Sequence, residues 1–196
     1  MSEETSGPVF DQQPIHAATA KRKFPWLLVG ECLLAAMILF LYLYRDFVFK
    51  KDVHRIPTKE KMKDVQVATG HYRTEYNRIP FPSTIPERDM EVRTQGTWIA
   101  ALIAQYDALN PRQIELLSLP SALEQRDGIY QDNNGEWVLT DPWGEMYYAI
   151  FDADYDGSIF NPETMKTEPE SRSVILYSAG PDRDPKTWKD NICSWR

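Results

Sequence analysis

The sequence predicts an α+β protein with a long N-terminal transmembrane spine helix, followed by short helices and a small C-terminal antiparallel β-sheet. Three observations lead to this fold class. Residues 26–44 form an apolar run, residues 62–76 show helical periodicity, and the residues after 128 contain short apolar segments separated by turn residues.

The apolar run reads WLLVGECLLAAMILFLYLY and contains one charged residue, Glu31. At about 1.5 Å per residue such a helix can cross a hydrocarbon core about 30 Å thick, so a transmembrane helix is predicted over 25–45. A buried core helix and a cleaved signal peptide are the alternatives; the basic flanks disfavour the first, and the length of the run disfavours the second. Glu31 is either a contact to a neighbouring helix or a charge tolerated near the interface.

The polar residues 1–24 are predicted to be a disordered N-terminal tail. Residues 46–80 are predicted to form a neck and a spine helix, with an interruption at Pro57 and Thr58 as the N-cap of the continuing helix. An apolar stripe at three- and four-residue steps supports this helix: Met62, Val65, Ala68 or Thr69, Tyr72 and Tyr76. Residues 81–196 are the predicted globular head.

Within the head, a second helix is predicted at about 95–108 and a short helical turn within 111–125. Apolar segments 129–131 and 136–139 flank Asp132-Asn133-Asn134-Gly135, which is typical of a β-hairpin. Residues 146–151 and 174–178 are further strand candidates.

The charge is distributed unevenly along this chain of net charge −7. Residues 45–63 hold seven basic and three acidic residues, which suits anionic lipid headgroups and by itself favours a cytoplasmic C-terminal domain. Residues 64–196 hold 22 acidic and 12 basic residues, a net charge of −10. Such a domain repels phosphate, so nucleic acid is not an expected partner.

No catalytic motif is apparent, and the chain is not expected to be an enzyme. The histidines, His16, His54 and His71, lack companions with metal-site or acid–base spacing, and no GxSxG, Walker or GxGxxG pattern is present. Cys32 lies in the apolar run and Cys193 near the C-terminus, so no internal disulfide is expected.

The sharpest local pattern begins at residue 152 and matches the twelve-position calcium loop D-x-D-x-D-G-x-I-x-x-x-E. Alternating carboxylates can surround one side of the ion, Gly157 permits the tight turn, and the last acid can close the site. The predicted ligands are Asp152, Asp154, Asp156, the carbonyl of Ser158, and Glu163. Because the preceding residues are predicted to be a strand, the loop is expected between strands; an acidic solvated turn is the alternative.

Three segments resemble the major pseudopilin of type II secretion systems. They are DPWGEMY (141–147), SAGPD…DNICSW (178–195) and HYRTEYNRIP (71–80), where the last resembles the end of the family's spine helix. One departure is that the family's leader, Gly followed by Phe-Thr-Leu-x-Glu, has no match at residues 23–28. This puts cleavage and N-methylation by a prepilin peptidase in doubt.

The resemblance implies a pilin-like fold and a structural subunit of a type II secretion or type IV filament machine. It implies other pseudopilin or secretion-system subunits as partners through the spine helix, membrane lipid around the span, and a single-pass inner-membrane location with a periplasmic C-terminal domain. It also implies calcium held by the C-terminal loop at Asp182 and Asp190, with Asp184 nearby. The alternative function is a membrane-tethered, calcium-dependent binding module with no filament role.

Overall fold

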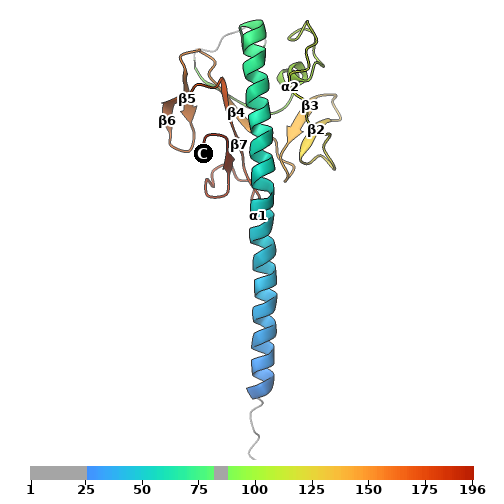
Figure 1. The fold of residues 1–196 in the computed structure, drawn as a ribbon, viewed down its shortest axis with the longest axis vertical. Coiled ribbons are helices and arrows are strands. Elements are labelled where there is room, and N and C mark those ends of the chain that lie inside the picture. The colour runs from blue at the N-terminus through green and yellow to red at the C-terminus, as the bar shows by residue number, and fades with distance from the viewer. Residues whose placement is uncertain (1–25, 82–87) are drawn as a thin grey trace, which may run out of the picture. The chain divides into compact units, whose positions relative to one another are not determined.

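The computed structural model describes the backbone of residues 26–81 and 88–196, and the side chains of 33–42, 53–81 and 88–196 (Figure 1). The chain divides into two units, residues 1–43 and 44–196. The predicted disordered tail, 1–24, lies outside the described residues.

Helix α1 spans Trp26–Tyr76, so residues 26–43 belong to the first unit and 44–76 to the second. The predicted interruption at Pro57 is wrong, because the helix continues through this residue. Thr58 is therefore not an N-cap. It is buried, and its hydroxyl donates to the carbonyl oxygen of His54, at 2.6 Å, in the preceding turn.

The predicted fold class is wrong in its transmembrane element. Among the described residues, no helix combines the length and the apolar character that crossing a membrane requires. The side chains described in the first unit are those of residues 33–42, and all of them are exposed.

The main sheet of the second unit has four strands in the order β1-β4-β7-β8. These are β1 (Met90–Arg93), β4 (Tyr148–Phe151), β7 (Val174–Ser178) and β8 (Ile192–Cys193), and every neighbouring pair is antiparallel. The predicted strands at 146–151 and 174–178 are thus confirmed as β4 and β7. The sheet is not purely C-terminal, because β1 precedes the short helix α2 (Thr97–Leu102) in the chain and forms the edge of the sheet.

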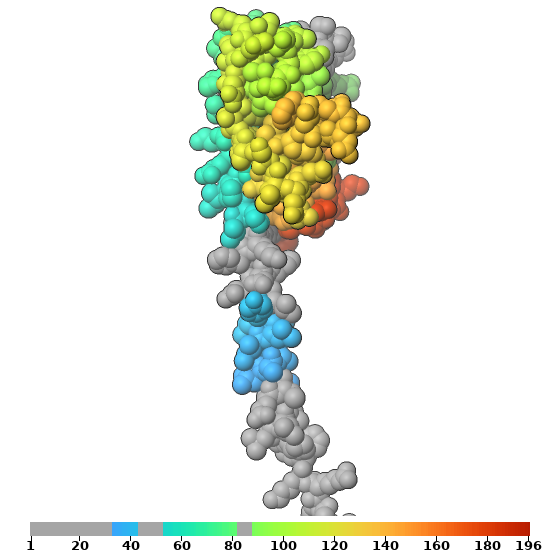
Figure 2. Space-filling model, turned by 90° about the vertical axis from the view of Figure 1, so that its right-hand side faces the viewer, coloured from blue at the N-terminus to red at the C-terminus, as the bar shows by residue number. Residues whose placement is uncertain are grey.

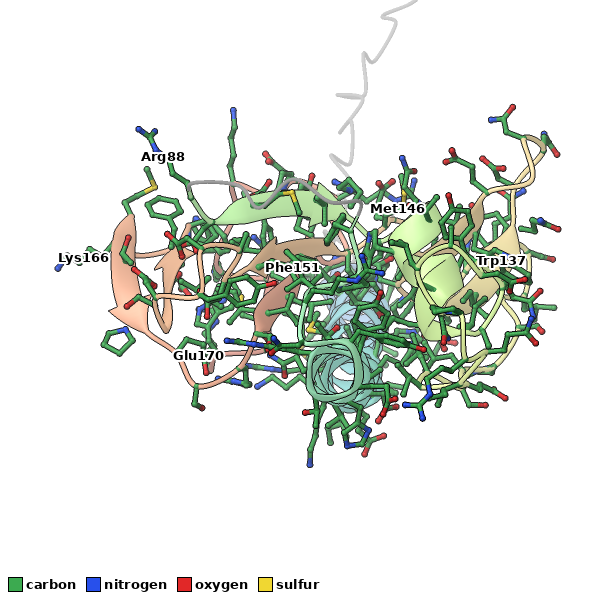
Figure 3. The ribbon with its side chains drawn as sticks, turned by 90° about the horizontal axis from the view of Figure 1, so that it is seen from above. Arg88, Trp137, Met146, Phe151, Lys166 and Glu170 are labelled. Carbon is green, nitrogen blue, oxygen red and sulfur yellow. The ribbon has the colours of Figure 1, made fainter. Side chains whose placement is uncertain are left out.

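Two antiparallel hairpins form separate sheets beside the main one. The predicted hairpin is confirmed as β2 (Gly128–Gln131) and β3 (Trp137–Thr140). The other, β5 (Ser158–Asn161) with β6 (Lys166–Pro169), was not predicted. Figures 1 and 3 show β5 and β6 on one side of α1, and α2 with β2 and β3 on the other.

Helical structure after α1 is shorter than predicted. The helix expected at 95–108 is only the six residues of α2, because Ala104 adopts a positive φ of 58° just after it. The helical turn expected within 111–125 is absent from these described residues. Figure 2 shows the face that α2, the following loop and the β2–β3 hairpin form next to α1.

The core lies between α1 and one face of the main sheet. Four residues of the predicted stripe, Met62, Val65, Ala68 and Tyr72, are buried there. Alternation along β4 separates the two faces: Ala149 and Phe151 join α1, whereas Ile150 packs on the other side with Ile159 of β5. One face of β4 therefore packs against the buried stripe of α1, and the opposite face packs against β5.

Candidate metal centre

The register of the main sheet brings two aspartates together. Met90 of β1 pairs with Phe151 of β4, so the next position of this antiparallel ladder has Asp89 opposite Asp152. Asp89 directly precedes β1 and Asp152 directly follows β4. Two like charges at directly opposed positions destabilise a sheet unless something compensates them.

The chain after β4 adds a third aspartate. Asp154 lies in the loop of residues 152–157, called here the β4–β5 loop, in which Tyr155 and Gly157 both have positive φ, 62° and 79°. Each of Asp89, Asp152 and Asp154 offers a carboxylate oxygen, and the three oxygens lie within 4.8 Å of one another. Because two ligands on opposite sides of a calcium ion are separated by about 4.8 Å, one ion can reach all three.

Two carboxylate oxygens of this cluster lack partners. Asp152 is only 2% exposed, and its Oδ1 has no hydrogen-bond partner among the described residues. Oδ1 of Asp89 is also buried without a partner, while its Oδ2 accepts from the backbone N–H of Phe160 at 2.5 Å. Buried carboxylate oxygens without donors are costly, so the cluster is chemically incomplete.

One guanidinium compensates part of the charge. Arg73 of α1 lies 3.6 Å from Oδ2 of Asp152 and donates to the hydroxyl of Ser173 at 3.2 Å. Its guanidinium carbon also lies 4.7 Å from the centre of the Tyr155 ring, and the Tyr155 hydroxyl accepts from the backbone N–H of Ile79. These contacts attach the β4–β5 loop to the end of α1, but they leave Oδ1 of Asp152 unpartnered.

The electrostatics are those of crowded carboxylates. Burial raises the pKa of Asp152, an effect that Arg73 opposes and that Asp154 and Asp156 reinforce. Burial likewise raises the pKa of Asp89, with the N–H of Phe160 opposing and the neighbouring aspartates reinforcing. The folded chain therefore favours protonation, or a cation, at this cluster.

The other predicted ligands of the calcium loop are placed differently. Asp156 lines a cavity of about 340 Å³ together with Asp89 and Asp154, and its Oδ1 accepts from the N–H of Ser158 at 2.7 Å. Ser158 itself begins β5. Arg88 also lines this cavity, and Figure 3 shows it on the side of the molecule that carries β6.

Glu163 does not join the aspartates. Its carboxylate accepts from the indole N–H of Trp195 at 3.0 Å and pairs with Arg196 at 2.6 Å. The reason is that residues 158–161 are strand β5 rather than the second half of a compact loop. A strand rises about 3.3 Å per residue, so β5 carries Glu163 away from Asp152.

In the C-terminal loop, residues 182–190, groups of the loop itself donate hydrogen bonds to the carboxylates of Asp182 and Asp184. Asp182 accepts from the Thr187 hydroxyl at 2.5 Å and from the N–H of Asp184 at 2.9 Å, and Asp184 accepts from the N–H of Lys186. Hydrogen bonding, chiefly from Thr187, lowers the pKa of Asp182, and Asp190 contributes to the same effect. Among the described residues, the carboxylate group that could hold a metal includes none of these three.

Asp89 is the cluster member that sequence reasoning missed. It follows a proline-rich segment with no ligand pattern, 63 positions before Asp152 in the chain. Only the pairing of β1 with β4 identifies it. Recognition of MEVR as a strand paired with residues 148–151 was the signal that could have found it.

A second network joins two of the three segments that resemble pseudopilins, 141–147 and 178–195. The fully buried Asp141 accepts from the Ser178 hydroxyl at 2.5 Å and from the N–H groups of Trp143 and Glu145, each at 2.9 Å. The Ser178 hydroxyl in turn accepts from the N–H of Gly180 at 3.0 Å. The Trp143 ring contacts His54 of α1 edge to face, so the DPWG turn, the SAGPD stretch and α1 are linked.

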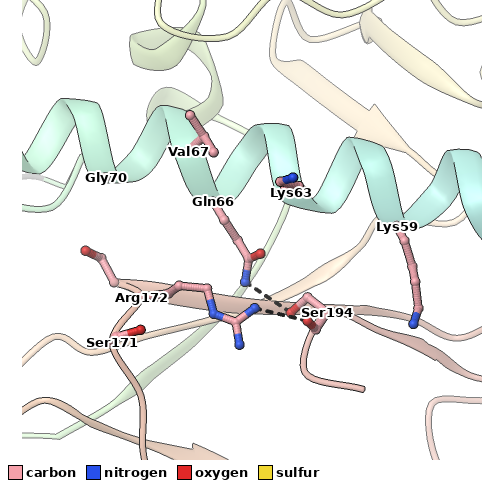
Figure 4. A pocket seen from close by; sticks show the side chains of 9 residues that line it. Lys59, Lys63, Gln66, Val67, Gly70, Ser171, Arg172 and Ser194 are labelled. Atoms are coloured by element: carbon pink, nitrogen blue, oxygen red, sulfur yellow. Dashed lines mark hydrogen bonds between the residues drawn. The ribbon is translucent and has the colours of Figure 1, made fainter.

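A hollow of about 510 Å³ lies beside α1 (Figure 4). Lys59, Lys63, Gln66, Val67 and Gly70 line it from the helix, and Ser171–Ser173 and Ser194 line the other side. In Figure 4, hydrogen bonds reach Ser194 from Gln66 and Arg172. No acidic residue is among those lining residues, which distinguishes this groove from the acidic second unit as a whole.

Two predictions about the N-terminal region fall outside the described side chains. Glu31 is within α1, but its side chain is not described, and the leader region at 23–28 is described only from residue 26.

Comparison with known proteins finds no matching family model, no matching curated protein and no matching solved structure.

Proposed function

We propose that this protein is a structural subunit of a type II secretion or type IV filament machine, related in role to the major pseudopilin. The observation that carries the proposal is the hydrogen bond between Ser178 and the buried Asp141. Two of the three segments that carry the resemblance, DPWGEMY and SAGPD…DNICSW, begin about 35 residues apart in the chain, and this bond makes them parts of one network. A proposal of function has to rest on such specific residue contacts and not on the fold class alone.

The groove beside α1 supports an assembly role. In a chain of net charge −7, Lys59, Lys63 and Arg172 surround a hollow without an acidic lining residue. Arg172 is paired with Glu170 at 2.8 Å, whereas Lys63 is exposed and makes no hydrogen bond or ion pair with the described residues. Val67, 48% exposed, adds apolar surface. A face that combines free positive charge with apolar surface suits packing against another subunit.

The first test is deletion of the gene in the native cells, followed by comparison of the proteins in the culture medium. We expect loss of a set of exported proteins, restored by the intact chain. An unchanged set of exported proteins would contradict the proposal and favour the alternative, a calcium-dependent binding module with no filament role.

The second test is a photo-crosslinking residue placed at Lys63, with the same residue at Leu123 as the matched control. Leu123 is 81% exposed but lies away from the groove residues in the chain. We expect crosslinks to a second copy or to another secretion-system subunit from position 63 and fewer from position 123. Equal crosslinking from the two positions would contradict the inference that the groove packs against another subunit.

A further inference from the structure

We propose that Asp89, Asp152 and Asp154 bind one calcium ion, which joins the start of edge strand β1 to the loop that follows β4. This inference is independent of the proposed secretion role. It also differs from the calcium loop predicted from the sequence, because Asp89 takes the closing position that the pattern assigns to Glu163.

The first argument is reach. The three carboxylates place oxygens within 4.8 Å of one another, which is the span across an ion with bonds of about 2.4 Å. Asp156 lines the same cavity as Asp89 and Asp154 and can complete the coordination together with water. Calcium takes about six to eight oxygen ligands, which carboxylates and water supply without help from other side chains.

The second argument is independent of the clustering. Asp152 is 98% removed from solvent and still has an oxygen without a partner, and Asp89 has another. A buried carboxylate normally accepts hydrogen bonds or coordinates a metal. Arg73, at 3.6 Å from the other oxygen of Asp152, leaves this requirement unmet.

The choice of metal follows from the donors. All three are carboxylates, and the group contains neither histidine nor cysteine, so hard cations are favoured over zinc or copper. Magnesium demands bonds of about 2.0 Å in near-ideal octahedral geometry. A buried aspartate, a half-buried one and an exposed one on different segments form the irregular, adaptable kind of site that calcium accepts.

The ion would act on the edge of the sheet. β1 pairs only with β4 among the described strands, and Asp89 directly precedes its first residue. Asp89 also accepts from Phe160 in β5, so a bound ion would connect β1, the β4–β5 loop and the start of the β5–β6 hairpin. We therefore expect calcium to stabilise the fold rather than to take part in a reaction.

The experiment titrates the full-length chain, stripped with EGTA, with CaCl₂ and separately with MgCl₂ in a calorimeter. We expect saturable calcium binding that is tighter than magnesium binding. Asp89→Asn should weaken calcium affinity by about tenfold or more, since a charged ligand is lost. Glu163→Gln and the control Asp132→Asn, a partly exposed hairpin aspartate that also accepts backbone N–H groups, should leave it within about twofold.

Thermal melting of the same variants gives a second readout that a mere folding defect cannot imitate. In EGTA, Asp89→Asn should melt at a higher temperature than the parent chain, because it relieves repulsion and its amide oxygen can still accept from Phe160. In calcium the order should reverse. Asp132→Asn should show no reversal.

The following outcomes would contradict the proposed site, its ligands or its metal. Absence of saturable calcium binding, or equal binding by the parent and Asp89→Asn, would overturn the site. Loss of binding in Glu163→Gln but not in Asp89→Asn would restore the loop predicted from the sequence. Magnesium binding as tight as calcium binding would overturn the assignment of the metal. None of these outcomes bears on the deletion test of the secretion role.

Discussion

The β4–β5 loop and the C-terminal loop are both rich in aspartate, and both were predicted to hold calcium, yet they meet the needs of their carboxylates in different ways. In the C-terminal loop Thr187 and backbone N–H groups donate to Asp182 and Asp184. In the β4–β5 loop Asp152 is buried with an oxygen unpartnered. The shifts in pKa follow the same division, downward for Asp182 and upward for Asp152. The supply of donors, and not the number of acids, separates a self-sufficient loop from one that favours a cation.

The largest effect is expected from Gly180→Ala, which tests whether the C-terminal loop depends on its backbone geometry. Gly180 has a φ of +72°, and an added Cβ would lie 2.6 Å from the carbonyl oxygen of Asp190. Strain and overlap together should lower the free energy of unfolding by about 3 kcal/mol. Urea denaturation should show the same loss in calcium and in EGTA. A loss that appears only in calcium would mean that this loop is also a metal site.

A smaller effect is expected from Thr187→Val, which removes a donor while nearly conserving volume. Asp182 then loses its shortest hydrogen bond and keeps the one from the backbone N–H of Asp184, so the C-terminal loop moves toward the condition of the β4–β5 loop. We expect a loss of about 0.5 to 1 kcal/mol in the free energy of unfolding, because the hydrogen bond is exposed. Denaturation curves of Thr187→Ser, which retains the hydroxyl, provide the control and should match the parent.

The smallest effects are expected in the pH dependence of stability, measured in EGTA, and they should have opposite signs in the two loops. The folded-state pKa of Asp89 is above its ordinary value of 3.8, so in the window between these values the folded chain binds more protons and stability falls as pH rises. The folded-state pKa of Asp182 is below 3.8, so its contribution is present above 3.8 and is lost as pH falls through the lower value.

Two variants separate these contributions in melting temperatures measured across that range. Asp89→Asn should reduce the loss of stability as pH rises above 3.8, whereas Asp182→Asn should reduce the loss as pH falls below it. If both variants changed the slope of melting temperature against pH in the same direction, the distinction between the two loops would be contradicted.

Local patterns in the sequence determined several elements correctly. The stripe of Met62, Val65, Ala68 and Tyr72 is buried as its period requires, since helical spacing and burial on one side are properties of the segment itself. The Asn-Gly turn before Glu136 likewise identified the β2–β3 hairpin, where Gly135 has a φ of +82°. Both signals involve residues close in the chain, so no distant partner was needed to interpret them.

The course of α1 at Pro57 and the membership of the acidic cluster depend on contacts between distant parts of the chain. Pro57 was expected to break α1, but the helix continues past it, and packing of the following turns against the sheet offsets the lost hydrogen bond. The calcium pattern included Asp152 and Asp154, which lie in an acidic group that could hold a metal, whereas β5 carries Glu163 away from that group and the pairing of β1 with β4 adds Asp89 to it. A ligand set joins residues that are far apart in sequence, and strand register is a long-range property that the spacing of one loop does not contain.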